Sequence, residues 1–208
     1  DLHKEYRRQR QMCIRDSGSS VAISDDGLTF AAGAQGSLVD GSTTGNYVKV
    51  YTYSNNAWQI VGSKIDGPSG SENFGHSIAL SSDGTILAVG DRKGGAYNKQ
   101  GIVNIYQYSS GSWSQLGSTI NGPSPISCGS TTFTNYFGFD VALSNDGTIV
   151  AIGSPERRQG GTCASVTSRG MVSVYQYSGG SWSQLGSDLN SDSSDELGWS
   201  VDLNSDGT

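Results

Sequence analysis

The chain has 208 residues, with 13 Lys and Arg against 19 Asp and Glu, and its formal net charge is −6. This acidic balance disfavours nucleic acid and anionic membranes as partners. No stretch is long and apolar enough to predict a membrane span. The 30 glycines, the 34% of hydrophobic residues and the low share of Lys and Glu favour an all-β protein with thin cores over long helices.

Residues 1–17 differ from everything that follows. They hold five Lys or Arg against three acids, and they lack the apolar core of a signal peptide. Met12-Cys13-Ile14-Arg15-Asp16-Ser17 resembles the translated end of a transposon adaptor used in sequencing libraries, so we predict a non-native or disordered tail. The alternative is a native basic tail that binds an acidic surface. Without the tail, eight basic and sixteen acidic residues remain, and the net charge is −8.

From residue 18 onward, one pattern recurs: two short apolar strands joined by an Asp-Gly turn. Its turn glycines are separated by 57, 63 and 60 residues, and they are Gly27, Gly84, Gly147 and Gly207. A fixed period of this size predicts repeats that each bury a face against the next copy. We place the repeats at about residues 18–73, 74–136 and 137–196, with the start of a further repeat at 197–208.

Each full repeat then predicts two more strands. A β-branched and aromatic stretch such as Val103-Asn104-Ile105-Tyr106 comes first, and after a Ser/Gly/Asn turn a stretch beginning with Trp58, Trp113 or Trp182 follows. Four meander-connected strands are the content of a propeller blade. The sequence therefore predicts an all-β fold, a β-propeller segment of about three four-stranded antiparallel blades plus the start of a fourth.

Phe74-Gly75, Phe137-Gly138 and Gly153-Ser154-Pro155 resemble motifs of the FG-GAP repeat family of β-propellers. The resemblance covers about residues 18–208. Closed propellers have 4–8 blades, so we expect a fragment whose partners include the remaining blades of the same parent chain.

The resemblance also raises a calcium site, because many FG-GAP repeats bind Ca²⁺ in an Asp-rich loop between the first two strands. A hard cation needs several oxygen ligands on one loop. The two middle repeats have Ala and Ser at the earlier ligand positions. The last copy restores Asp-x-Asn-x-Asp-Gly with Asp202, Asn204 and Asp206, which makes it a weak candidate; ordinary turn chemistry is the alternative. We expect no other cofactor.

Cys128 and Cys163 lie in two enlarged connections, which a four-stranded meander places on the same face of the propeller. We predict a disulfide between them, and with it an oxidising compartment, extracellular or at the cell surface. Two free thiols are the alternative. Two sulfurs are too few for a zinc site.

The same face gathers the variable loops that carry function in propellers. The third residue of each Phe-Gly motif begins the innermost strand and differs between copies, and loop residues add aromatic and cationic side chains that suit contact with a protein or glycan. The candidate binding residues are His76, Phe139, Trp199, Arg92, Tyr97, Tyr136 and Arg157. Alternatively, the aromatics plug the central channel. The repeated Trp58, Trp113 and Trp182 indicate packing between blades rather than a carbohydrate platform.

Catalytic motifs are missing from the sequence. His76 is the only histidine in the repeats, and neither a Ser-His-acid order nor a Gly-x-Ser-x-Gly elbow is present. We therefore predict no enzyme, but a non-catalytic binding or adhesion module of a secreted or surface protein. Two alternatives remain: part of a propeller hydrolase whose catalytic residues lie in missing blades, and a structural spacer.

Overall fold

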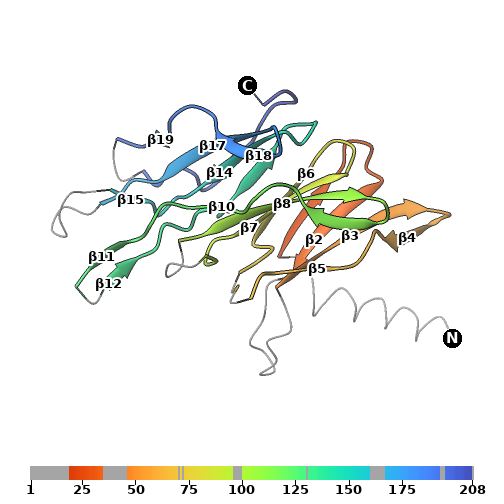
Figure 1. The fold of residues 1–208 in the computed structure, drawn as a ribbon, viewed down its shortest axis with the longest axis horizontal. Coiled ribbons are helices and arrows are strands. Elements are labelled where there is room, and N and C mark those ends of the chain that lie inside the picture. The colour runs from red at the N-terminus through yellow and green to blue at the C-terminus, as the bar shows by residue number, and fades with distance from the viewer. Residues whose placement is uncertain are drawn as a thin grey trace.

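The computed structural model describes residues 19–34, 46–69, 71, 73–95, 100–129, 131–159, 167–192 and 195–207. The predicted tail, residues 1–17, lies outside these ranges. Throughout the described ranges the chain forms strands and turns without a helix, so no helix there is long and apolar enough to cross a membrane. The strands run side by side in three successive units (Figure 1).

The first unit is a meander with the strand order β1-β2-β3-β4. Its strands are β1 (Ser20–Ile23), β2 (Thr29–Ala34), β3 (Tyr47–Ser54) and β4 (Ala57–Ile60). A short strand β5 (Ile65–Asp66) pairs with the other end of β3. The outer strand is therefore split into two pieces along one long neighbour.

The second and third units repeat this arrangement. In the second unit the strands are β6 (Ser77–Leu80), β7 (Ile86–Asp91), β8 (Ile102–Ser109), β9 (Ser112–Gln115) and β10 (Ile120–Asn121). In the third they are β13 (Val141–Leu143), β14 (Ile149–Gly153), β17 (Met171–Ser178), β18 (Ser181–Gln184) and β19 (Leu189–Asn190).

Two hairpins extend the connections of the third unit. β11 (Ile126–Cys128) pairs with β12 (Thr131–Phe133) before the unit begins, and β15 (Arg158–Gln159) pairs with β16 (Thr167–Ser168) between its second and third strands. Figure 1 shows both hairpins at the same end of the molecule. They lie in the two enlarged connections that hold Cys128 and Cys163 in the sequence.

A Ser-x-Asp-Gly segment forms the turn between the first two strands of each unit, and Thr follows it in the second and third units. In the third unit the Ser144 hydroxyl donates to Asp146 Oδ1 at 2.7 Å, and the backbone N–H of Thr148 donates to the same oxygen at 2.9 Å. These bonds lower the pKa of the Asp146 carboxyl below its ordinary value, the bond from the Thr148 N–H most of all. The small polar residues thus satisfy the backbone of a tight turn.

Backbone hydrogen bonds link these turns across the units. The N–H of Asp25 donates to the carbonyl of Ser82 at 3.1 Å, and the N–H of Ser82 donates to the carbonyl of Asn145 at 2.9 Å. The series continues from Asn145 to Ser205 at 2.9 Å. Segment 197–207 therefore lies beside the third unit as the inner strand of each unit lies beside its predecessor.

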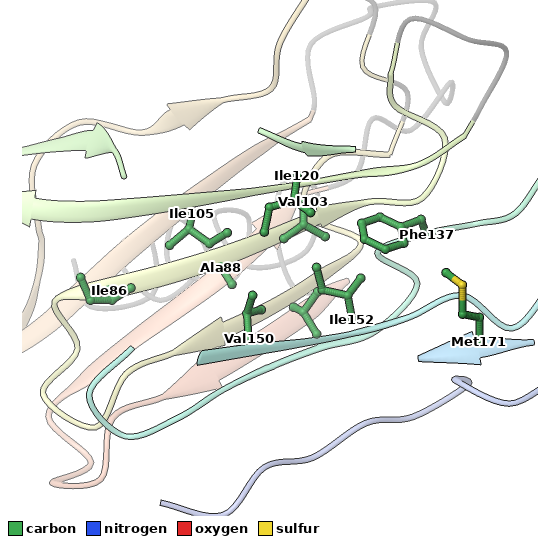
Figure 2. Close-up of a cluster of buried hydrophobic side chains, with 10 residues drawn as sticks. Ile86, Ala88, Val103, Ile105, Ile120, Phe137, Val150, Ile152 and Met171 are labelled. Atoms are coloured by element: carbon green, nitrogen blue, oxygen red, sulfur yellow. The ribbon is translucent and has the colours of Figure 1, made fainter. Parts of the chain in front are cut away.

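The hydrophobic core lies between neighbouring units. Between the second and third, Val103 and Ile105 lie opposite Val150 and Ile152, and Phe137 belongs to the same cluster (Figure 2). Phe137 is fully buried, as is its counterpart Phe74 in the preceding junction. The Phe of the Phe-Gly motif is therefore a core residue between units.

Candidate functional site

The third residues of the Phe-Gly motifs form an aromatic row. The rings of His76 and Phe139 lie 5.0 Å apart, and those of Phe139 and Trp199 lie 4.6 Å apart, both edge to face. Each residue lies at the start of the inner-strand segment of its repeat. These segments are neighbours, because β6 contacts both β1 and β13. The structure thus brings together three side chains from three repeats. Ser19, the counterpart in the first repeat, donates its hydroxyl to the Gly33 carbonyl instead, at 3.0 Å.

Arg92 joins this row from the loop after β7. Its guanidinium carbon lies 5.3 Å from the ring centre of Tyr136 and 5.6 Å from that of Phe139. Its Nε donates to the side-chain oxygen of Asn73 at 3.3 Å. Two aromatic faces and one hydrogen bond thus hold the cation in place. Among the residues that the structure describes, Arg92 forms no ion pair.

Asp91 ties the Arg92 loop to the segment that leads into His76. Its carboxylate is fully buried and accepts hydrogen bonds from the backbone N–H of Asn73 at 3.2 Å, from that of Lys93 at 3.1 Å, and from the Ser71 hydroxyl. A buried carboxylate with several donors is held rigidly. Asp91 therefore fixes the position of Arg92 relative to His76.

His76 is half-buried, and its imidazole is neutral at physiological pH. The pKa of His76 is lowered to about 4, by burial most of all and by the positive charge of Arg92, while the carboxylate of Asp140 opposes both. A neutral imidazole accepts a proton on one nitrogen and donates from the other. The row therefore combines a neutral proton acceptor with a fixed cation.

Asp140 is a site residue that the sequence analysis missed. The first and second repeats have Ser20 and Ser77 at this position, and their hydroxyls donate to the carbonyls of Gly75 and Gly138 in the next repeat. Asp140 instead accepts from the backbone N–H of Val201 at 2.8 Å. Comparing the copies for a change of Ser to Asp would have revealed it.

Tyr136 and Glu196 are strained at equivalent places, directly before the third and fourth copies of the motif. Both have positive φ angles, 52° and 54°, which cost residues other than glycine free energy. Tyr136 thereby presents its ring to Arg92, and Glu196 accepts from Trp199 Nε1 at 2.9 Å. Of this pair, the sequence analysis proposed only Tyr136.

Two predicted binding residues remain, and the structure describes only one of them, Arg157. Arg157 is half-buried and donates from Nη1 to the carbonyl of Arg158 at 2.7 Å, and burial lowers its pKa. Its neighbour Arg158 lies over the ring of Phe133 at 4.3 Å, which joins the two extra hairpins. Within the described residues Arg157 has no contact with the row. Tyr97 lies outside the described residues.

Cys128 is disulfide-bonded. Its predicted partner, Cys163, lies outside the described residues, so this pairing and the compartment inferred from it stay predictions.

The calcium candidate lies in segment 197–207. Asp202 Oδ1 accepts from the backbone N–H of Leu203 at 2.9 Å, and the carbonyl of Asn204 accepts from Gly207 N–H at 3.1 Å. Over the described part of the chain, no three His, Cys, Asp or Glu side chains are grouped to hold a metal. The site at Asp202, Asn204 and Asp206 stays a prediction from the sequence.

Comparison with known proteins gives a fold but no family. No family model matches the chain, and neither does any curated protein. A solved structure of a candidate 6-phosphogluconolactonase from Bacteroides fragilis is 13% identical, with a TM-score of 0.53 over 86% of this chain. One from Bacteroides uniformis is also 13% identical, with a TM-score of 0.53 over 83% of this chain. The chain spans about 40% of the length of each.

The fold is that of a β-propeller segment. The three units are its blades, β1, β6 and β13 are inner strands, and the predicted fold class is confirmed. Membership of the FG-GAP family is not shown, because no family model matches.

The preference for a non-catalytic, extracellular adhesion module is corrected by the same comparison. The solved propellers that the chain resembles are named as candidate enzymes, and nothing in the comparison points to adhesion. The expectation that the chain is no enzyme conflicts with this enzyme-like fold. The adhesion hypothesis rested on the short Phe-Gly motif, but in this chain Phe74 and Phe137 of that motif are buried between blades.

Proposed function

We propose that the chain is part of a propeller hydrolase and that the row of His76, Phe139 and Trp199, together with Arg92, contributes to its substrate site. The observation that carries this proposal is a fixed cation, Arg92, that forms no ion pair with the described residues and lies next to a neutral imidazole at the start of the inner strands. Groups whose ionisation is shifted by burial and by a specific neighbour are frequent at active sites.

The proposed substrate is an anionic, sugar-derived ester or lactone. Arg92 is positioned to bind a phosphate or carboxylate, because its guanidinium is held by Tyr136, Phe139 and Asn73 and keeps donors for a ligand. Trp199 is 51% exposed at the end of the row and offers an aromatic face to a sugar ring. The names of the similar structures point to the lactone of 6-phosphogluconate.

In this proposal His76 acts as a general base. Lactone hydrolysis needs a water molecule to lose a proton as it attacks the carbonyl carbon, and an imidazole that is unprotonated at pH 7 can take it. The imidazolium then returns this proton to the ring oxygen as the bond between that oxygen and the carbonyl carbon breaks. Asp140 favours the imidazolium that results, because its carboxylate raises the pKa of His76. Remaining groups of the site would come from further blades, because the described chain spans only part of the similar propellers.

Calorimetric titration of the chain with 6-phosphogluconate tests the anion site. Arg92→Gln should weaken binding about ten-fold or more, because one charged hydrogen-bonding partner is lost. Arg158→Gln is the matched control, since Arg158 also lies over an aromatic ring but on the hairpin β15–β16. Equal binding by both variants, or no binding by the unaltered chain, would contradict the proposal.

We also propose that the repeat is related to the FG-GAP repeat. This second proposal concerns how the repeat is built and not what the protein does. Phe137 is fully buried, and Gly138 has φ 80° with its carbonyl directed at Gly90, where a Cβ would lie 2.4 Å from that oxygen. The motif therefore serves the close approach of two blades. A profile built from complete parent sequences would test this relation.

A further inference from the structure

Asn135 is a buried residue that links three segments of the chain at the junction of the second and third blades. It is fully buried, and its Nδ2 donates to the carbonyl of Pro123 at 2.7 Å. Its backbone carbonyl accepts from the hydroxyl of Ser154 at 2.6 Å, and Ser154, which directly follows β14, is fully buried as well. Asn135 is therefore held through both its side chain and its backbone.

Stability alone does not account for an asparagine at this position. Within the part of the chain that the structure describes, the Oδ1 atom of Asn135 has no hydrogen-bond partner. Burying a polar atom without a partner costs free energy, and such atoms are rare in folded proteins. The value of Asn135 therefore lies in what its two hydrogen bonds hold in place.

The next residue, Tyr136, is strained, with a positive φ of 52°. A tyrosine persists in this conformation only where its surroundings fix the chain. Asn135 fixes the chain on one side, and on the other the N–H of Phe139 donates to the Tyr136 carbonyl at 3.0 Å. Asn73, the equivalent residue before the second motif, has no positive φ. The repeat itself therefore does not impose the strained conformation.

The strained residue holds the cation of the site. The ring centre of Tyr136 lies 5.3 Å from the guanidinium carbon of Arg92. From the other junction, Asn73 accepts from Arg92 Nε at 3.3 Å, and its backbone N–H donates to the buried Asp91. Asp91 and Ser154 are equivalent residues, each directly after the glycine in the second strand of its blade. Both junctions thus use this place to fix the residue that contacts the cation.

We propose that Asn135 is a positioning residue of the substrate site. Together with Ser154 it holds Tyr136 in the strained conformation, and the ring of Tyr136 keeps the Arg92 cation beside His76. The inference rests on the proposed function, in which Arg92 binds the anion and His76 is the base. The position of Arg92 can nevertheless be tested without turnover.

Titration of His76, followed by NMR in the full chain, tests the position of the cation. Burial lowers the pKa of His76 most, Arg92 lowers it as well, and Asp140 raises it. In Asn135→Ala the Tyr136 ring is released and Arg92 loses a partner, so the pKa of His76 should rise from about 4 toward its ordinary value of 6.5. Arg92→Gln sets the upper limit of this rise, because the charge is then absent.

Asn104→Ala is the matched control. Asn104 is also a buried asparagine with one amide atom that has no partner among the described residues, and it accepts from the Thr119 hydroxyl at 2.6 Å. It lies on β8 and has no described contact with the aromatic row. Asn104→Ala should therefore destabilise the chain and leave the pKa of His76 unchanged.

Calorimetric titration with 6-phosphogluconate gives a second measurement. Asn135→Ala should weaken binding about two- to five-fold, the worth of one contact between a cation and an aromatic ring. Ser154→Ala removes a single hydrogen bond, so it serves if Asn135→Ala does not fold, and it should shift the pKa of His76 in the same direction.

Two results would overturn the inference. One is a pKa of His76 that stays unchanged in both Asn135→Ala and Ser154→Ala. The other is an equal rise in Asn104→Ala, since the effect would then come from general loosening of the fold. Failure of the unaltered chain to bind 6-phosphogluconate would contradict the proposed function alone, because the titration of His76 still decides the position of Arg92.

Discussion

The substitution Phe137→Ala separates residues that hold the blades together from residues that form the site. Phe137 is fully buried in the cluster between the second and third blades, and a Cβ on Gly122 would lie 2.5 Å from its own Cβ. Truncating a fully buried phenylalanine leaves a cavity and costs about 3–5 kcal/mol. That is a large part of the ~5–15 kcal/mol by which a native domain is stable. Phe74→Ala should cost a similar amount, because Phe74 fills the equivalent place.

Phe139→Ala is the internal control, two residues further along the same motif. Its ring is half-buried in the aromatic row and contacts His76 and Trp199 instead of the core. Its loss should cost about 1 kcal/mol, the scale of an aromatic pair, while it weakens ligand binding. Urea unfolding followed by circular dichroism gives the free energies. Equal losses for Phe137→Ala and Phe139→Ala would refute the division between core and site.

Three further predictions follow from the turns, the imidazole and the indole. Gly147→Ala should destabilise the chain by about 1–3 kcal/mol more than Gly27→Ala. Both glycines have φ 70°, but only a Cβ on Gly147 would meet a side chain, that of Ile86 at 2.6 Å. Equal melting temperatures of the two variants would contradict this. The pKa of His76 falls from 6.5 when unfolded to about 4 when folded, so the unfolded state binds more protons between these values. The free energy of unfolding should therefore fall as pH drops from 6.5 to 4. A His76→Gln variant should show a flatter dependence on pH, and a variant with the same pH dependence as the unaltered chain would argue against a buried imidazole. Trp113→Phe should lower the free energy of unfolding by about 1 kcal/mol, because the hydrogen bond from Trp113 Nε1 to the Val61 carbonyl is lost. Trp58→Phe should leave the free energy of unfolding unchanged, because Trp58 is exposed. Equal shifts of the two urea midpoints would show that this hydrogen bond adds no stability.

The repeating strands could be predicted because each carried its own local signal. Asp-Gly turns and β-branched stretches mark β1 to β4 and their copies, and periodic copies confirm one another. The two-residue strands β5, β10 and β19 have no periodicity to detect. Each of them forms because the long third strand of its blade extends past the glycine that interrupts the outer strand. The backbone groups at that end of the third strand pair with the short strand. Neither hairpin, β11–β12 nor β15–β16, was predicted, since both lie in connections of irregular composition.

The site could be predicted only as far as the repeats themselves point to it. The third residues of the motifs were found because they vary while their neighbours repeat, and the structure places His76, Phe139 and Trp199 in contact. Asn73 and Asp91 were missed, because their role depends on a loop contact that no spacing reveals. The functional class was predicted wrongly, because the Phe-Gly motif reports how blades pack and not what they bind.

Hydrolysis of the proposed phosphorylated lactone, measured with the protein at the length its gene encodes, tests the central claim most directly. The proposal predicts turnover at pH 7, and His76→Gln should lower kcat about 100-fold or more while the fold stays intact. Turnover that is unchanged in His76→Gln would remove the imidazole from the mechanism. Absence of turnover in the unaltered protein would contradict the proposed lactone substrate.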